Sequence, residues 1–223
     1  DLSTNAFTIT VTLVNDVPAV AYVTNNVVVL EDAGAQSVSG FATFTAGPAD
    51  ESAQAAAYTL TADNAALFSV QPALAANGTL TFTPTANANG SAIVTVITAD
   101  SGGTANNGTD RSTNSFTITV TAVNDQPSAS YAMSTVTVLE DAGAQTVSSF
   151  ATFIAGPSDE SAQTAAYTLT ADNVALFSVQ PAIAANGTLT FTPAANANGS
   201  ATVTVVLQDG GGTTGGGVDK ATN

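Results

Sequence analysis

The sequence contains no cysteine, no histidine and no tryptophan, and only two of its 223 residues, Arg111 and Lys220, are basic. Without Cys the chain can form neither disulfides nor thiolate metal sites, so thiols reveal nothing about its redox compartment. Without His or Cys, the Ser–His and Cys–His arrangements of nucleophilic catalysis cannot be built. Asp50 and Glu51 form the most obvious acid pair, but adjacent residues in an extended loop point apart, whereas a glycosidase needs two carboxylates facing each other across a cleft. We therefore expect no enzymatic activity.

The charge balance is strongly acidic, with 17 Asp and Glu residues and a formal net charge of −15. Nucleic acids and anionic membrane surfaces attract Lys- and Arg-rich faces, which this chain lacks. No apolar run approaches the roughly 20 residues needed to span a bilayer. The composition therefore indicates a partner other than nucleic acid and no membrane insertion, with divalent cations as the natural counter-charge.

The chain repeats itself. Shifted by 109 residues, it aligns with itself without a gap, and 80 of the 109 positions of the first repeat are identical in the second by direct count. A unit of this length is long enough to be a complete domain, and 44% apolar residues are enough to form two cores. The sequence therefore predicts a tandem array of two like domains.

Apolar and polar residues alternate with a period of two along most of each repeat. Phe7, Ile9 and Val11, for example, alternate with three threonines, which is typical of a half-buried strand. We expect strands over residues 7–12, 27–30, 37–46, 56–62, 67–70, 79–83 and 93–99 of the first repeat, and over the copy of residues 7–12 at 116–121. About seven short strands between Gly, Pro, Asn and Asp turns predict an all-β fold of antiparallel β-sandwiches of immunoglobulin-like shape, without the Cys–Trp–Cys core of antibody domains.

The strand FTITVT ends in the same Asn-Asp-x-Pro segment at 15–18 and at 124–127. We therefore expect residues 1–17 to be a last strand and linker, 18–126 to be one sandwich, and 127–223 to be a second sandwich that lacks its final strand. Two alternatives remain for the missing strand. Either the 223 residues are a window on a longer array, or residues 6–14 of one chain complete the second domain of another, head to tail, which builds a filament.

Every acidic position recurs in each repeat that covers it, and most of these positions lie at strand ends or in loops. Carboxylates gathered at a domain end repel one another unless a cation lies among them, and calcium accepts six to eight oxygen ligands in loosely specified geometry. The alternative is that these acids cap turns through their side-chain oxygens.

The segment ADSGGTANNGTDRSTNSFTITVTAVNDQP resembles the closing segment of cadherin-type repeats, A-x-D-x-G, then a strand, then D-x-N-D-N-x-P. The whole unit resembles the cadherin-like and immunoglobulin-like repeats of large bacterial surface adhesins, which often carry V-N-D-x-P linkers. The resemblance implies calcium at the domain junctions, held at the middle junction by Glu31, Asn124, Asp125, Asp159, Glu160 and Asp209, with Asp32 adjacent. By the same resemblance Asn15, Asp16, Asp50, Glu51 and Asp100 serve a junction with a preceding unit, and Glu140 one with a following unit.

This sequence departs from the family where PTANANG, residues 84–90, replaces an acidic D-R-E segment, so fewer ions are expected than at a cadherin junction. We interpret the chain as a non-enzymatic, calcium-stiffened spacer or fibre segment on a bacterial cell surface, whose partners are neighbouring repeats of the same or an identical chain. The alternatives are a head-to-tail filament subunit and a carbohydrate- or ligand-binding module.

Overall fold

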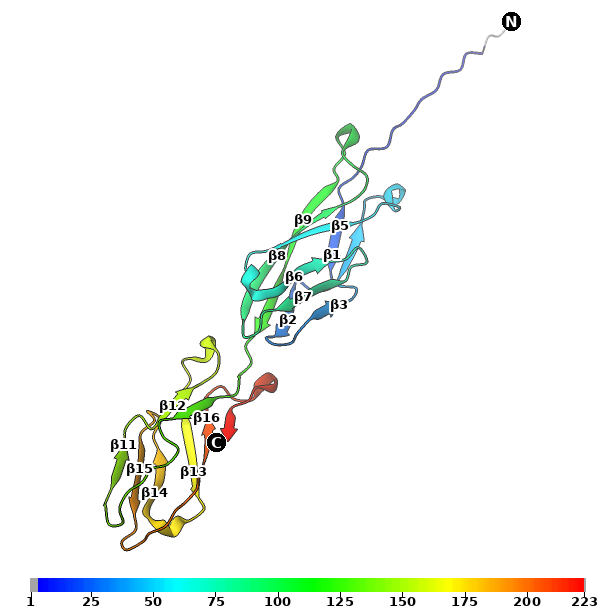
Figure 1. The fold of residues 1–223 in the computed structure, drawn as a ribbon. Helices are drawn as coiled ribbons and strands as arrows, with labels where there is room; N and C mark the ends of the chain where they lie inside the picture. Colours follow the sequence, from blue (N-terminus) through cyan, green and yellow to red (C-terminus); the bar gives the residue numbers. More distant parts are fainter. Residues whose placement is uncertain (1–3, 223) are drawn as a thin grey trace. The chain divides into compact units, whose positions relative to one another are not determined.

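The computed structural model describes residues 4–222, which form two compact units divided between Ala122 and Val123. The Asn-Asp-x-Pro segment at 124–127 thus belongs to the unit that follows it. Both units consist of strands joined by loops and three-residue 3₁₀ turns (Figure 1). Within residues 4–222, no helix is long and apolar enough to cross a membrane. The all-β sandwich fold predicted from the sequence is confirmed.

Residues 4–122 of unit 1 form three sheets. The largest has four strands in the order β2-β9-β8-β5, the second has the order β3-β7-β6, and β1 pairs with β4. The strands are β1 (Ala19–Tyr22), β2 (Asn26–Leu30), β3 (Gln36–Val38), β4 (Ala42–Thr45), β5 (Ala57–Ala62), β6 (Phe68–Leu74), β7 (Leu80–Pro84), β8 (Gly90–Ala99) and β9 (Arg111–Thr121), and the 3₁₀ turns are η1 (Ala49–Glu51), η2 (Ala65–Leu67) and η3 (Ala105–Asn107).

Strand β9, which contains the second FTITVT, is central to unit 1. It lies between β8, which is antiparallel to it, and β2, which is parallel to it. The parallel pair is a departure from the purely antiparallel sandwich expected from the sequence. As the period of two predicts, Phe116, Ile118 and Val120 are at most 2% exposed and fill the core. The threonines between them point away from it.

The core of unit 1 lies between the β9 sheet and the β7 sheet. Phe116 meets the rings of Tyr22 and Phe41 at centroid distances of 5.2 and 4.8 Å, both edge to face. Leu80 and Val94 are completely buried. Contacts of this kind between aromatic and branched side chains from different sheets fix the two layers against each other.

Unit 2 repeats the same arrangement with fewer strands. Its sheets have the orders β13-β16-β17, β11-β15-β14 and β10-β12. The strands are β10 (Ser128–Tyr131), β11 (Gln145–Val147), β12 (Ala151–Ile154), β13 (Ala166–Ala171), β14 (Phe177–Ile183), β15 (Leu189–Pro193), β16 (Val203–Gln208) and β17 (Lys220–Thr222), and the 3₁₀ turns are η4 (Ser158–Glu160), η5 (Val174–Leu176) and η6 (Thr214–Gly216).

The two units differ where β9 stands in unit 1. β17 corresponds only to the first three residues of β9, and the 223 residues contain no counterpart of residues 115–121. Residues 135–139, the counterpart of β2, form no strand, and β16 begins four residues later than the counterpart of β8. Phe150, Leu176 and Val203 are half-buried in unit 2, whereas their counterparts in unit 1 are buried.

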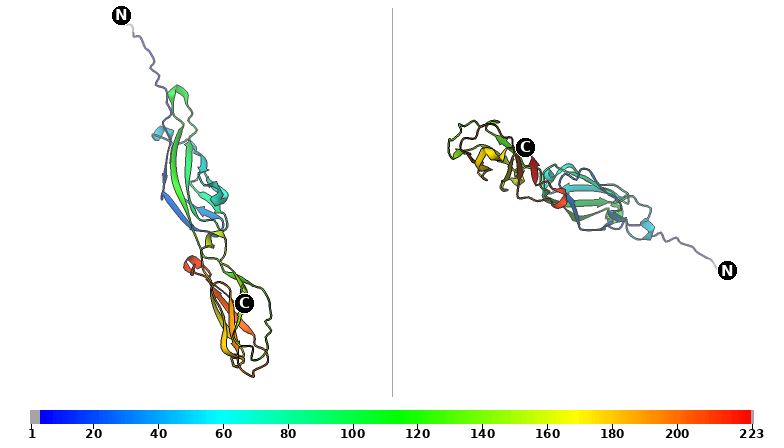
Figure 2. Two further views of the ribbon diagram at one scale, coloured as in Figure 1. Left: turned by 90° about the vertical axis from the view of Figure 1, so that its left-hand side faces the viewer. Right: turned by 90° about the horizontal axis from the view of Figure 1, so that it is seen from below.

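Three expectations about local structure are wrong. Residues 7–12 form no strand: they are extended and exposed, because nothing within residues 4–222 pairs with them (Figure 1 and Figure 2). Residues 37–46 form two strands, β3 and β4, separated by a turn at Gly40, whose φ of +65° favours glycine. Asp50 and Glu51 lie in the 3₁₀ turn η1 instead of an extended loop, with Glu51 buried and Asp50 exposed.

Candidate metal-binding ends of the two units

Asn15 organises the end of unit 1 at which the chain enters. Its side chain is 6% exposed, and its Nδ2 donates to Asp100 Oδ1 at 3.0 Å and to the Thr109 carbonyl at 2.9 Å. Its Oδ1 accepts from Gln54 Nε2 at 2.8 Å. A single amide thus joins the linker to the loops that follow β8 and η1.

The neighbouring residue, Asp16, is held through its backbone. Its N–H donates to Glu51 Oε1 at 2.8 Å, and Glu51 is only 2% exposed. Turn η1 buries this carboxylate by directing it towards the linker. The second oxygen, Glu51 Oε2, is buried and accepts no hydrogen bond from the described residues, and the same holds for Asp100 Oδ2 and Gln54 Oε1. Buried oxygens without a donor are costly and call for a ligand or an explanation.

Unit 2 builds the same end from the second copy of the residues. Asn124 Nδ2 donates to Asp209 Oδ1 at 3.1 Å and to the Val218 carbonyl at 2.9 Å, and Gln163 Nε2 donates to Asn124 Oδ1 at 2.8 Å. The Asp125 N–H donates to Glu160 Oε1 at 2.7 Å. Glu160 Oε2 is again buried without a hydrogen-bond partner among residues 4–222. The arrangement is therefore a repeated feature of the fold.

The acids at this end of unit 2 are close enough to interact electrostatically. Burial raises the pKa of the Glu160 carboxyl above its ordinary value, and the negative charges of Asp125, Asp159 and Asp209 raise it further. The hydrogen bond from the Asp125 backbone opposes this increase. A cation among these carboxylates would oppose the increase in pKa, because a nearby positive charge favours the ionised carboxylate.

In each unit, two glycines leave the space that the linker Asn and the buried Glu side chains occupy. A Cβ at Gly102 would collide with Asn15 Oδ1, and a Cβ at Gly47 would collide with Glu51 Oε2. Gly211 and Gly156 have the same relation to Asn124 and Glu160. These glycines and the glutamines Gln54 and Gln163 recur in both repeats but were not predicted as site residues, because none of them carries a charge.

Glu31 and Asp32 lie at the other end of unit 1, beyond the last residue of β9. The Glu31 N–H donates to the Thr121 carbonyl at 2.9 Å, and its carboxylate, in a residue 3% exposed, accepts from Asn89 Nδ2 at 3.3 Å. Asp32 Oδ1 accepts from the Asn87 N–H at 3.1 Å. The PTANANG segment, which lacks the acids of the cadherin pattern, thus supplies amide partners for these two carboxylates.

Glu140 occupies the corresponding place in unit 2, where Asn198 Nδ2 lies 3.4 Å from its Oε2. Unlike Glu31, it is exposed, because no strand covers residues 135–139. Its role at a following junction stays a prediction.

The structure brings the predicted residues together in groups that each belong to one unit. Asn15, Asp16, Glu51 and Asp100 meet in unit 1, as do Asn124, Asp125, Glu160 and Asp209 in unit 2, whereas Asp50 and Asp159 are exposed beside them. Within residues 4–222, no group of three or more acidic side chains is arranged to hold a metal ion. The oxygen donors suit a hard cation, but each end supplies only part of a coordination sphere. The site shared by Glu31 with the second group stays a prediction.

The four tyrosines bear on the carbohydrate-binding alternative. Tyr22 and Tyr58 pack against the core of unit 1, and Tyr131 and Tyr167 against that of unit 2. None of the four stands open on a strand face as a platform for sugar rings, which weakens that alternative.

The fold places the chain among tandem cadherin-like or immunoglobulin-like sandwiches. Residues 123–222 match a family model described as a cadherin-like domain, so unit 2 has a cadherin-like fold, and unit 1 shares it by internal repetition. Cadherin-like domains are extracellular adhesion or structural modules and are typically non-enzymatic. A comparison with curated proteins returned no match.

Solved cadherin structures align with both units at low identity. Mouse protocadherin-24 EC1-3 is 14% identical over 92% of this chain and 68% of its own, with a TM-score of 0.49. The human desmocollin-1 ectodomain is 15% identical over 92% of this chain and 35% of its own, with a TM-score of 0.38. Chicken VE-cadherin EC1-2 is 19% identical over 91% of this chain and 97% of its own, with a TM-score of 0.37. With TM-scores below 0.5, these alignments add nothing to the fold assignment.

Proposed function

We propose that the chain is a non-enzymatic, extracellular spacer segment of a bacterial surface adhesin, in which calcium bound at the ends of the units restricts hinging between them. The observation that carries this proposal is the buried carboxylate of Glu51, repeated in Glu160. One oxygen of each accepts the N–H of the linker Asp, and the other is buried without a protein partner. Calcium is the ion whose ligand preferences suit these oxygens.

The mechanism follows from the position of this carboxylate. Asn124 and Asp125 are anchored on unit 2, and only two residues separate Asn124 from Thr121, where β9 of unit 1 ends. An ion that binds the second oxygen of Glu160, and draws its other ligands from the preceding unit, would remove the remaining freedom of this short connection. Glu31 and Asp32 are the proposed donors from the preceding unit.

Calorimetric titration with calcium, together with small-angle scattering with and without chelator, tests the proposal. We expect calcium binding, and a shorter and broader distribution of interatomic distances after chelation. Glu160→Gln is expected to weaken binding about tenfold or more, whereas Asp172→Asn should leave it unchanged. Asp172 is a matched control, because it carries the same charge but accepts the Thr202 N–H at the opposite end of β16. No heat of binding and an unchanged maximum dimension would refute the proposal.

A head-to-tail filament subunit is a second candidate function. It is favoured by a separate observation, the open groove in unit 2 where unit 1 contains β9.

A further inference from the structure

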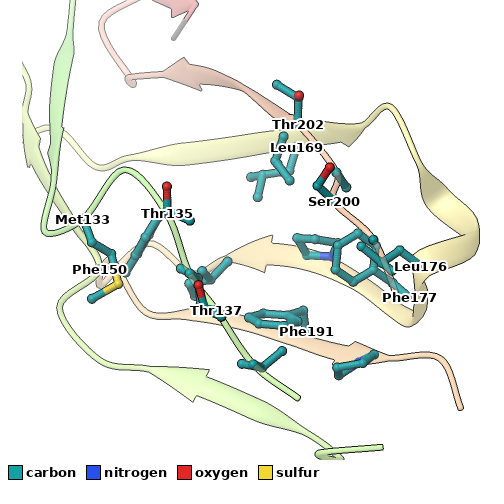
Figure 3. Close-up of a pocket in the computed structure, with 18 of the residues that line it drawn as sticks. Met133, Thr135, Thr137, Phe150, Leu169, Leu176, Phe177, Phe191, Ser200 and Thr202 are labelled. Atoms are coloured by element: carbon teal, nitrogen blue, oxygen red, sulfur yellow. The ribbon is translucent and has the colours of Figure 1, made fainter. Parts of the chain in front are cut away.

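Unit 2 has a groove of about 980 Å³ that follows the course of a missing strand. One rim is formed by residues 133–140 and the other by residues 197–203. Figure 3 shows Thr135 and Thr137 on the first rim, Ser200 and Thr202 on the second, and the side chains of Leu169 and Phe191 between them. The floor is therefore apolar, and each rim is formed mainly by residues that belong to no strand in the part of the chain that the structure describes.

Unit 1 shows what fills such a groove. There, Asn26–Leu30 pair in parallel with Thr117–Thr121, while Gly90–Val94 pair antiparallel with residues 116–120 of the same strand. The groove thus requires a strand that bonds on both edges and presents three large apolar side chains on one face. In unit 1 these are Phe116, Ile118 and Val120, each at most 2% exposed.

In unit 1, the strands on either side of β9, β2 and β8, also hold β9 through polar side-chain contacts. The Thr119 hydroxyl donates to Asn26 Oδ1 at 3.0 Å and lies 3.5 Å from the Ser91 hydroxyl. The aligned positions in unit 2 are Thr135 and Ser200, both hydroxyl residues. An incoming threonine is therefore matched on both sides.

Residues 7–12 carry the strand that meets these requirements. Their sequence FTITVT is identical to residues 116–121, with Thr10 at the position of Thr119. Phe7, Ile9 and Val11 are 86%, 76% and 89% exposed, an unusual state for three large apolar side chains on one face. The segment is already extended, so little reordering is needed for strand addition.

We propose that residues 6–14 of a second copy of the chain occupy the groove of unit 2, with Phe7, Ile9 and Val11 against its floor. In the register of unit 1, Ile9 pairs with Val136 in parallel and with Ala201 antiparallel. The donor segment from Phe7 to Asn15 spans at most about 29 Å. β9 of unit 1 alone is about 33 Å long, so the donor segment, anchored on unit 1 at Asn15, is too short to pass unit 1 and fill the groove of its own chain. This favours a second copy over the same chain as the source. The inference rests on the filament function and deepens it by naming the partner and the register.

The contact joins different surfaces of the two copies. Each chain presents a donor strand at one end and a groove in its second unit, so the association does not close on itself and produces open-ended oligomers. In chelator, sedimentation velocity from about 1 µM to 1 mM is expected to show a concentration-dependent series of multiples of 21.9 kDa. Chelator keeps this test independent of calcium, so its failure and the failure of the spacer function are distinguishable.

Substitutions in the donor strand test the mechanism without endangering the fold, because the donor residues are exposed in the single chain. Ile9→Asp is expected to weaken association at least a hundredfold. Thr12→Asp introduces the same charge at the counterpart of Thr121, which stays exposed in unit 1, and should change association less than threefold. A monomeric parent chain at all concentrations, or equal association of the two variants, would overturn the proposal.

Disulfide trapping tests the register, since the chain has no cysteine of its own. Thr10→Cys in one chain and Ser200→Cys in another place two thiols at the positions of the Thr119–Ser91 pair, and we expect rapid cross-linking on oxidation. The matched pair Thr10→Cys and Thr202→Cys is two residues out of register and is expected to cross-link at least tenfold more slowly. Equal rates, or no cross-link in either pair, would contradict the register.

Discussion

Asn15→Ala is expected to destabilise unit 1 by about 3 kcal/mol. The substitution removes a hydrogen bond to the Asp100 carboxylate and two bonds to neutral partners, the Thr109 carbonyl and the Gln54 amide. A bond to a charged group contributes about 1.5–3 kcal/mol and a neutral bond about 0.5–1.5 kcal/mol. The sum is about 2.5–6 kcal/mol, and water that enters the vacated space lowers the loss towards the small end of that range.

Hydrogen exchange of peptides from β8 and β9, followed against urea, measures unit 1 separately from unit 2. With a slope of about 1–3 kcal/mol per molar urea, the midpoint should fall by roughly 1–3 M. Asn114→Ala is the control: Asn114 is an exposed strand residue opposite Val96, and its truncation should cost less than about 0.5 kcal/mol. An Asn15→Ala loss below about 1 kcal/mol would refute the view that this amide anchors the linker.

Two further substitutions probe the buried acid and the central strand. Because burial raises the pKa of Glu160 above 4.5, folded unit 2 binds a proton more tightly than the unfolded chain. In chelator its free energy of unfolding should therefore fall as pH rises from below 4.5 through the raised pKa, and then level off. Glu160→Gln should flatten this pH dependence in urea titrations between about pH 4 and 7, and an unchanged slope would contradict the assignment of the raised pKa to Glu160. Ile118→Ala, at a fully buried position of β9, should lower the free energy of unfolding of unit 1 by about 2–5 kcal/mol in the same exchange assay. A loss under about 1 kcal/mol would mean that β9 is not central to the core.

Period-two alternation predicted most strands of the fold because it reports burial on one face, which FTITVT shows at 116–121. The same six residues at 7–12 pair with no strand in the described part of the chain, and their own sequence could not reveal this, because pairing depends on partners far away in the chain. The parallel pairing of β2 with β9 was likewise out of reach, since alternation specifies a face and not a direction. The turn at Gly40 was missed because apolar residues continue on both sides of it.

The candidate site was predicted in part. Recurrence in both repeats pointed to Glu51 and Asp100, because acids at strand ends are conspicuous in a chain with few charges, whereas Asn15 was predicted from the recurring Asn-Asp-x-Pro segment and the cadherin resemblance. Gln54 and Gly102 recur equally but are not acidic, and only the folded geometry shows that one donates to Asn15 and the other leaves room for it. The burial of Glu51 beside the exposed Asp50 depends on η1, a single 3₁₀ turn with no periodic signature.

The linker ties two consecutive units through opposite ends of one short segment. FTITVT completes the unit before it, and β9 ends at Thr121. Asn124, two residues beyond Ala122, is already hydrogen-bonded to the Asp209 carboxylate of the unit that follows. Only Ala122 and Val123 thus separate the end of β9 from the anchored residue Asn124, which leaves few free backbone torsions in this connection.

Strand addition from a second copy would reproduce this connection. Thr12 corresponds to Thr121 and Asn15 to Asn124, and Asn15 is anchored to Asp100 in the same way. A non-covalent junction would therefore have the same strand, the same two-residue step and the same anchor as the covalent one. Electron micrographs of the assembled chain are accordingly expected to show one axial spacing per unit along a filament. Alternating long and short spacings would mean that the two kinds of junction differ, and would contradict the register inferred from unit 1.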